Sequence, residues 1–239
     1  MAGVMVPLRV RARLATGVAQ AAPWGIALDG LLASVLWEQH KAQTVGYERA
    51  MDSTVAPPDL ELPLARCELA GPSWHWAASC ALPEPGSRVQ VRSWTGRVDA
   101  RALEQMAAGL PRTVSARQGR YRARRMPLLV SVCPSVSWQA VGDPQRIAEL
   151  LEEVVVIGKK RAMGEGQVLG WQVSPQPDLG VFEAGHLHAD GSLGRPVPAV
   201  CRAKAGQVPD GGWGRAGLRP PYMHPARQQD LYLPALLDS

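Results

Sequence analysis

The sequence predicts an α+β domain of the ferredoxin-like, or RNA-recognition-motif-like, βαββαβ type. Three observations indicate it: strand-like alternation at residues 6–15, helical apolar spacing over 26–43 and 142–158, and apolar strand-like segments between and after these helices. Such a domain packs both helices on one sheet face and leaves the other open to a ligand. We place it at residues 1–175, with a basic thumb-like insertion at about 97–126 and a Pro- and Gly-rich extension at 176–239.

The first strand and the first helix have the clearest patterns. Residues 6–15 alternate between apolar side chains and Arg9, Arg11 and Arg13, which is typical of a half-buried strand with a basic outer face. Residues 26–43 carry apolar residues at helical spacing, and Asp29 lies near the start, where a carboxylate favours a helix N-terminus.

The middle of the chain predicts a hairpin, a short helix and a buried strand. Residues 73–83 and 87–96 have strand-like composition and are joined through "EPG", which favours a hairpin. Residues 99–111 predict a helix closed by Gly109 and Pro111. The arginine-rich stretch 112–125 has no apolar periodicity, so we expect a loop or a projecting β-ribbon, followed by a buried strand over 126–138.

The second long helix has a strong start signal. Asp143 is the expected N-cap and Pro144 occupies the first helical position. We expect Gly158 to end this helix, a basic glycine-rich loop to follow, and residues 166–175 to form the last strand. Residues 176–239 show weak periodicity, so we expect an irregular tail that packs over the domain or over a neighbouring subunit.

Composition excludes several classes of protein. Hydrophobic residues make up 46% of 239 residues, which is enough for a core and excludes a disordered chain. No apolar run approaches the length of a transmembrane helix, and the N-terminus lacks the apolar core of a signal peptide. We therefore expect a cytoplasmic protein without a membrane partner.

The cysteines give no motif. Cys67, Cys80, Cys133 and Cys201 are widely scattered and form no CxxC pair, which favours free, buried thiols. A zinc site would require some of them to converge with His75, His186 or His188, and the tight paired spacing of zinc ligands is absent. We therefore predict no metal and no cofactor.

Arginine is concentrated in one part of the chain. Between residues 97 and 125 the only acidic side chains are Asp99 and Glu104. The arginines of this stretch are Arg97, Arg101, Arg112, Arg117, Arg120, Arg122, Arg124 and Arg125. Clustered arginine is the electrostatic footprint expected for a polyanion, most often a nucleic acid. The alternative is an arginine-rich solvated surface.

The stretch "IGKKRAMGEGQVLGW", residues 157–171, suggests contact with phosphate but is not a nucleotide-binding loop. It lacks GxxxxGK[ST] and GxGxxG, and it runs from a helix to a strand, so no helix N-terminus points at phosphate. Lys159 and Lys160 could simply complement the end of the preceding helix. The nearby glycines favour instead a backbone against which another chain lies while the cations neutralise its phosphates.

These features together resemble the RAMP superfamily of CRISPR effector subunits. The G-[basic]-x-[basic]-x-x-G-x-G loop of "IGKKRAMGEG" is the most specific feature. The segments "GIALDGLLASVL", "SARQGRYRARRMPL" and "LRPPYMHPARQQDLYLP" are similar to the first helix, the basic segment and the C-terminal end of the Csf-type RAMP subunit of type IV systems.

The resemblance implies a non-catalytic subunit that caps the 5′ handle of the CRISPR RNA and nucleates the type IV effector ribonucleoprotein. Its implied partners are the CRISPR RNA, RAMP backbone subunits, other type IV effector subunits, and target DNA close to the handle. The RNA-facing loop would contain Gly158, Lys159, Lys160, Arg161, Gly164 and Gly166. The thumb-like projection would contribute Arg112, Arg117, Arg120, Arg122, Arg124 and Arg125.

The main alternative is a RAMP-type endoribonuclease that processes precursor CRISPR RNA with a histidine general base. The candidate histidines are His40, His75, His186, His188 and His224, but no His–Lys–Tyr grouping is close in sequence, so we expect no catalysis. "HLH" at 186–188 would place two imidazoles on one face of a strand, where they could bind a metal, although we favour a solvated hairpin. Trp74, Trp76 and Trp94 are candidates for base stacking on the open sheet face.

Overall fold

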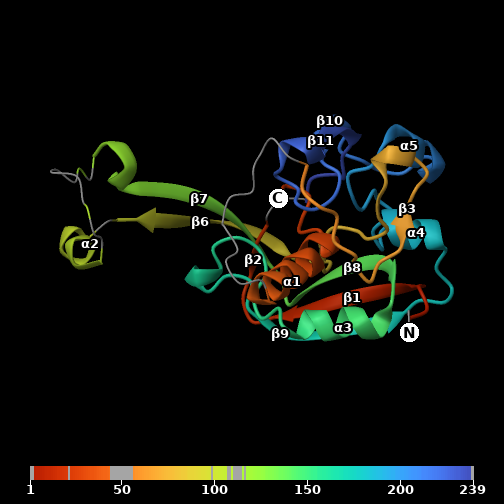
Figure 1. The fold of residues 1–239 in the computed structure, drawn as a ribbon, viewed down its shortest axis with the longest axis horizontal. Helices are drawn as coiled ribbons and strands as arrows, with labels where there is room; N and C mark the ends of the chain where they lie inside the picture. The colour runs from red at the N-terminus through yellow and green to blue at the C-terminus, as the bar shows by residue number, and fades with distance from the viewer. Residues whose placement is uncertain are drawn as a thin grey trace.

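The computed structural model describes residues 3–20, 22–43, 56–97, 99–106, 109, 115 and 117–237. A long two-stranded arm, with a short helix near its tip, projects from a body that contains the other sheets and helices (Figure 1). The predicted α+β class is confirmed, and the strands pair in antiparallel ladders. Within these ranges, no helix combines the length and the apolar character needed to cross a membrane.

The main sheet is centred on β1 (Val6–Leu14). Its neighbours are β8 (Ser135–Gly142) and β9 (Val168–Pro175), and β5 (Leu82–Pro83) pairs with the outer edge of β8, so the order is β5-β8-β1-β9. The predicted alternation of β1 is confirmed: Leu8, Val10 and Ala12 are fully buried, while the arginines between them are exposed.

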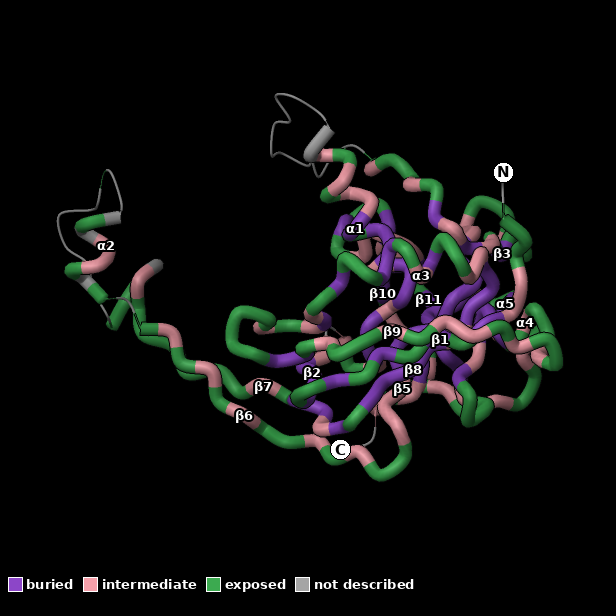
Figure 2. The backbone as a smooth tube through the Cα atoms, turned by 90° about the horizontal axis from the view of Figure 1, so that it is seen from below, coloured by how far each residue is buried: buried purple, intermediate pink, exposed green. Residues whose placement is uncertain are grey.

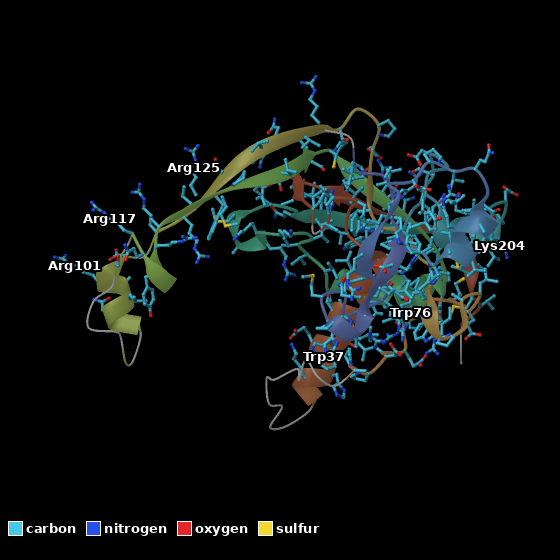
Figure 3. The ribbon with its side chains drawn as sticks, turned by 90° about the horizontal axis from the view of Figure 1, so that it is seen from above. Trp37, Trp76, Arg101, Arg117, Arg125 and Lys204 are labelled. Carbon is cyan, nitrogen blue, oxygen red and sulfur yellow. The ribbon has the colours of Figure 1, made fainter. Side chains whose placement is uncertain are left out.

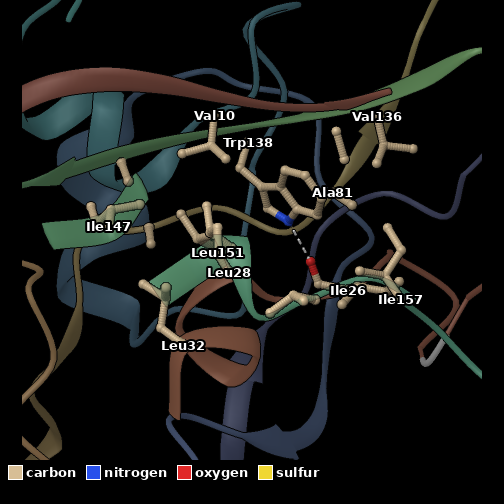
Figure 4. Close-up of a cluster of buried hydrophobic side chains, with 14 of the residues drawn as sticks. Val10, Ile26, Leu28, Leu32, Ala81, Val136, Trp138, Ile147, Leu151 and Ile157 are labelled. Atoms are coloured by element: carbon tan, nitrogen blue, oxygen red, sulfur yellow. Dashed lines mark hydrogen bonds between the residues drawn. The ribbon is translucent and has the colours of Figure 1, made fainter. Parts of the chain in front are cut away.

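Two helices cover the inner face of this sheet. Both α1 (Leu28–Gln43) and α3 (Pro144–Glu152) contribute apolar side chains to one core cluster with β1 and β8. Trp138 of β8 lies inside this cluster, and its indole N–H donates to the carbonyl oxygen of Ile26 over 2.7 Å (Figure 4). The bond satisfies a polar group that would otherwise be costly to bury.

The predicted start of α3 is confirmed and its predicted end is wrong. The side chain of Asp143 accepts hydrogen bonds from the backbone N–H groups of Gln145 and Arg146, as an N-cap does. The helix ends at Glu152, well before Gly158, because the β-branched residues that follow run extended beside the start of β9. The N–H of Val168 donates to the carbonyl of Val155 there, over 2.9 Å.

The arm, residues 88–132, is a long β-ribbon. Its strands β6 (Arg88–Gly96) and β7 (Arg124–Val132) pair along their whole length, and β2 (Val18–Ala19) joins the base of β7. Helix α2 (Ala100–Met106) and a 3₁₀ turn, Gly119–Tyr121, lie near the tip. The predicted short helix is thus confirmed over 100–106, while Pro111 lies outside the described residues.

Two strand predictions in this region are wrong. Residues 73–83 and 87–96 do not pair as a hairpin, because β5 pairs with β8 while β6 pairs with β7. Residues 126–138 do not form one buried strand. They belong to β7, whose outer half is exposed, and to β8, which is buried. Local apolar composition marks strands but does not fix which strand each one pairs with.

The C-terminal extension, residues 176–239, has more regular structure than predicted. It contains α4 (Val181–His186), α5 (Ala199–Ala205), and the antiparallel pair β10 (Trp213–Gly217) and β11 (Gln228–Tyr232). It packs against the ribbon of β3 (Arg66–Cys67) and β4 (His75–Trp76) and against the main body. Figure 2 shows that the buried residues gather in the body, whereas most of the arm is intermediate or exposed.

Candidate nucleic-acid interface

The glycine-rich loop, residues 158–166, is built from left-handed backbone conformations. Gly158, Gly164 and Gly166 have φ angles of 83°, 84° and 75°, and Lys160 adopts 59°. A short 3₁₀ turn, Arg161–Met163, lies between Lys160 and Gly164. Glycine favours such angles and a lysine does not, so the tertiary contacts of Lys160 must hold it there.

Two of the three glycines are required by the fold of this chain itself. A Cβ on Gly158 would lie 2.4 Å from the carbonyl oxygen of Ala19, and one on Gly166 would lie 1.9 Å from that of Ile157. A Cβ on Gly164 would meet nothing within 4 Å, and this residue is exposed. Gly164 is therefore favoured by its left-handed φ angle, and its N–H and carbonyl oxygen are already bonded to Arg161 and Thr16, whereas Gly158 and Gly166 allow close packing inside the protein.

The cations of the loop do not complement a helix end, because α3 stops at Glu152. Lys159 and Arg161 are exposed and lie on either side of Lys160. The ammonium of Lys160 is 3.4 Å from the ring centroid of Trp94 on β6, a cation–π contact. The alternative that the lysines only balance a helix dipole therefore fails for this loop.

A second contact joins the loop to the arm. Nη1 of Arg92, on β6, donates to Oε1 of Glu165 over 2.6 Å, and the side chain of Glu165 is largely buried. Arg92 and Trp94 share one face of the β-ribbon, since alternate residues of a strand point the same way. The loop thus lies against β6, next to the point where the predicted basic insertion begins at about residue 97.

The arm carries a dense positive charge. Residues 88–132 contain ten arginines and two acidic residues, while the rest of the chain has more acidic than basic residues. The described arm arginines whose side chains are exposed are Arg88, Arg97, Arg101, Arg117, Arg122, Arg124 and Arg125. Figure 3 shows Arg101, Arg117 and Arg125 spread along the arm, away from the body. Arg120 lies in the 3₁₀ turn near the tip, and Arg112 lies outside the described residues.

The open face of the main sheet is basic and polar, not aromatic. Arg9, Arg11 and Arg13 project from it, and Arg11 forms an ion pair with Glu84. The three tryptophans proposed for stacking lie elsewhere. Trp76 is in the core, and the half-buried Trp74 packs against that core between Arg66 and Arg219. Trp94 is on the arm, beside the loop cation Lys160.

The sequence interpretation did not include Arg92, and it assigned Trp94 to base stacking and not to contact with the loop cation Lys160. A signal for them was present, because "SRVQVRSWTG" alternates polar and apolar residues and so places both side chains on one strand face. Their partners Glu165 and Lys160 lie about 70 positions away along the chain and could not be found from spacing alone.

Four of the five histidines are buried, and they do not form a solvated pair. His186 ends α4 and His188 follows it, both with little exposed area, so the interpretation of 186–188 as a solvated strand hairpin is wrong. Burial lowers the pKa of His75 and of His188 to about 4, so both rings are neutral near pH 7. His40 is exposed near the end of α1 and stacks on Trp37.

Comparison with known protein families finds a match over most of the chain. The family model described as "CRISPR type IV associated protein Csf3" matches residues 6–181. The chain belongs to the Csf3 family. This matched segment includes the main sheet, the glycine-rich loop and the entire arm, and it ends at the first residue of α4. No curated protein is similar enough to this chain to count as a match.

Proposed function

We propose that this chain is a non-catalytic, RNA-binding subunit of a type IV CRISPR ribonucleoprotein. One observation carries the proposal: the glycine-rich loop and the arginine-rich arm meet through Lys160–Trp94 and Arg92–Glu165. We infer that their exposed cations form one continuous surface. A family of type IV CRISPR associated proteins supplies the biological context.

The surface suits an RNA backbone better than a compact ligand. Lys159 and Arg161 are exposed close to the exposed Gly164, and the arm extends the positive charge well beyond the body. Phosphate contacts by lysine and arginine supply affinity without reading sequence. We assign this surface to the 5′ handle of the CRISPR RNA, with target DNA close by and RAMP backbone subunits as protein neighbours.

The sheet order supports an RNA-recognition-motif-like domain. If β5 is counted as the second strand of the domain, the order β5-β8-β1-β9 and the antiparallel pairings agree with a βαββαβ domain. The arm is then an insertion between the two strands of the β5–β8 hairpin. The main alternative, a RAMP-type endoribonuclease, would need a histidine that can reach RNA. Since His75, His186, His188 and His224 are all buried, the structure gives this alternative no support from them.

The test compares two double variants of the full-length chain for binding to CRISPR repeat RNA. Lys159→Ala with Arg161→Ala removes exposed loop cations, whereas Arg146→Ala with Arg215→Ala removes the same charge from the body, where each arginine faces an acid. We expect the loop variant to weaken binding about tenfold or more at low salt, and the control to have little effect.

Two outcomes would contradict the proposal. Equal binding by both double variants would show that the loop does not face RNA. Metal-independent cleavage of the RNA by the wild-type chain, abolished by His40→Ala, would favour the endoribonuclease.

A further inference from the structure

Two cysteines and two histidines converge where the C-terminal extension meets the body. We call them the Cys/His cluster, which consists of Cys67, His75, His186 and Cys201. Cys67 and His75 are direct partners across the β3–β4 ribbon, His186 is the last residue of α4, and Cys201 lies in α5. All four are buried, and their ligand atoms lie within 4.8 Å of one another.

The distances between like atoms match a tetrahedral metal site. The Sγ atoms of Cys67 and Cys201 are 3.8 Å apart, and the Nε2 atoms of His75 and His186 are 3.0 Å apart. A tetrahedral zinc ion, with its usual bond lengths to sulfur and nitrogen, separates two thiolates by about 3.8 Å and two imidazole nitrogens by about 3.3 Å. A disulfide would need its sulfurs at about 2.05 Å, so the two cysteines are not joined.

The surroundings of His186 also suit a metal ligand. Its Nδ1 lies 2.8 Å from the carbonyl oxygen of Phe182. Because a carbonyl oxygen can only accept, Nδ1 carries the proton, and Nε2 has a free lone pair directed at the cluster. The ring of Phe182 stacks on His186 with centroids 4.1 Å apart, which fixes the imidazole plane. A surface hollow lined in part by Arg66 and Lys204 reaches Cys67 and His186, so an ion can enter.

We propose that the Cys/His cluster binds one structural Zn²⁺ ion. Two thiolates, two neutral imidazoles and a divalent cation make a neutral unit, which can be buried at little electrostatic cost. Four protein ligands complete the coordination shell and leave no open position for substrate, so the role is structural and not catalytic.

The hydrophobic core of the extension is small, so a metal ion would add to its stability. The apolar cluster around it contains Cys67, Leu193, Val197 and Cys201 with three partly buried neighbours, which is a small core for a region with two short helices. Small structural units commonly rely on a metal when their hydrophobic core is limited. The ion would join α4 and α5 to the β3–β4 ribbon, so it would fasten the extension to the body.

The first measurement is the metal content of the full-length chain purified without added metal or chelator. We expect about one equivalent of zinc per chain. After removal of zinc, titration of the wild-type chain with Co²⁺ should give the intense visible bands of tetrahedral cobalt and a thiolate charge-transfer band. This measurement does not depend on any variant folding correctly. Absence of zinc together with absence of these bands would overturn the proposal.

Matched variants then test the ligands. Cys201→Ser and His186→Gln should lose nearly all of the zinc, whereas Cys133→Ser and His188→Gln, which alter buried residues outside the cluster, should retain it. Alkylation adds an independent readout: chelator should expose Cys67 and Cys201 to the reagent and leave Cys80 and Cys133 unchanged. Equal zinc loss from His186→Gln and His188→Gln would overturn the assignment of ligands.

Discussion

In the arm, arginine side chains extend into solvent, whereas in the C-terminal extension Arg195 is only 1% exposed. Its guanidinium donates to the carbonyl oxygens of Ala78 and Leu218 over 2.9 and 2.8 Å, and Nη2 lies 3.5 Å from Oδ2 of Asp29 on α1. An arginine side chain therefore holds buried segments together in the extension, whereas in the arm arginine side chains are exposed to solvent.

The arm and the extension differ in what their polar side chains contact. The arm is held by one long strand ladder and by the contacts of β6 with the glycine-rich loop. Most of its arginines form no ion pair with the described acidic side chains, so we expect a polyanion to bind there. The extension depends on buried polar groups: the hydroxyl of Tyr222 donates to Asp29 over 2.5 Å, and burial raises the pKa of Asp29 while Arg195 opposes the shift. Changes in the extension should therefore affect stability, and changes in the arm should affect RNA binding.

The largest expected effect is on stability, from Asp29→Ala. This variant leaves the buried guanidinium of Arg195 without its counter-ion, which should lower the free energy of unfolding by about 3–5 kcal/mol. Asp230→Ala is the matched control, because Asp230 pairs with Arg215 at 4.0 Å on the surface and should contribute about 0–1 kcal/mol. Urea denaturation measures both. Equal decreases in the two variants would show that the Asp29–Arg195 pair does not hold buried segments together.

The second effect is on RNA affinity, from neutralising the arm. Replacing Arg117, Arg122, Arg124 and Arg125 by Ala should reduce the slope of log affinity against log salt by about 0.7 for each phosphate of single-stranded RNA that is no longer neutralised. The free energy of unfolding should change little, because these side chains are exposed. Fluorescence anisotropy at several salt concentrations measures the slope. An unchanged slope would mean that the arm contacts protein and not RNA.

Local patterns in the sequence predicted several elements of the body and the composition of the arm. The alternation of β1, the apolar faces of α1 and α3, and the N-cap at Asp143 depend on neighbouring residues, so the sequence pattern reports them directly. The charge of the arm and the glycine-rich loop also follow from composition and spacing. Whether the arm and the loop bind RNA remains a prediction.

Long-range pairings were not predictable in the same way. The Cys/His cluster joins elements up to 134 positions apart, and α4 and α5 have only six and seven residues, too few to show a helical period. The scattered cysteines favoured free thiols because zinc ligands are usually recognised by paired spacing, and here the pairing is across a strand ladder. Only the fold brings these side chains together.

The smallest expected effect concerns the cation–π pair that joins the loop to the arm. Lys160→Ala and Trp94→Ala should each weaken RNA binding, and the double variant should be weakened by less than the sum, because one cation–π pair can be removed only once. We expect a coupling free energy of about 0.5–1 kcal/mol, the range for partly exposed cation–π pairs. Double-mutant cycles on RNA affinity, measured by fluorescence anisotropy, give this value.

A parallel cycle of Lys159→Ala with Trp94→Ala is the matched control. It should be additive, since Lys159 is an exposed neighbour of Lys160 and the ammonium above the Trp94 ring belongs to Lys160. Additivity in the Lys160 cycle as well would mean that the loop and the arm bind RNA independently. The single continuous surface proposed for this subunit would then have to be treated as two separate RNA-binding surfaces that are joined by the Arg92–Glu165 ion pair.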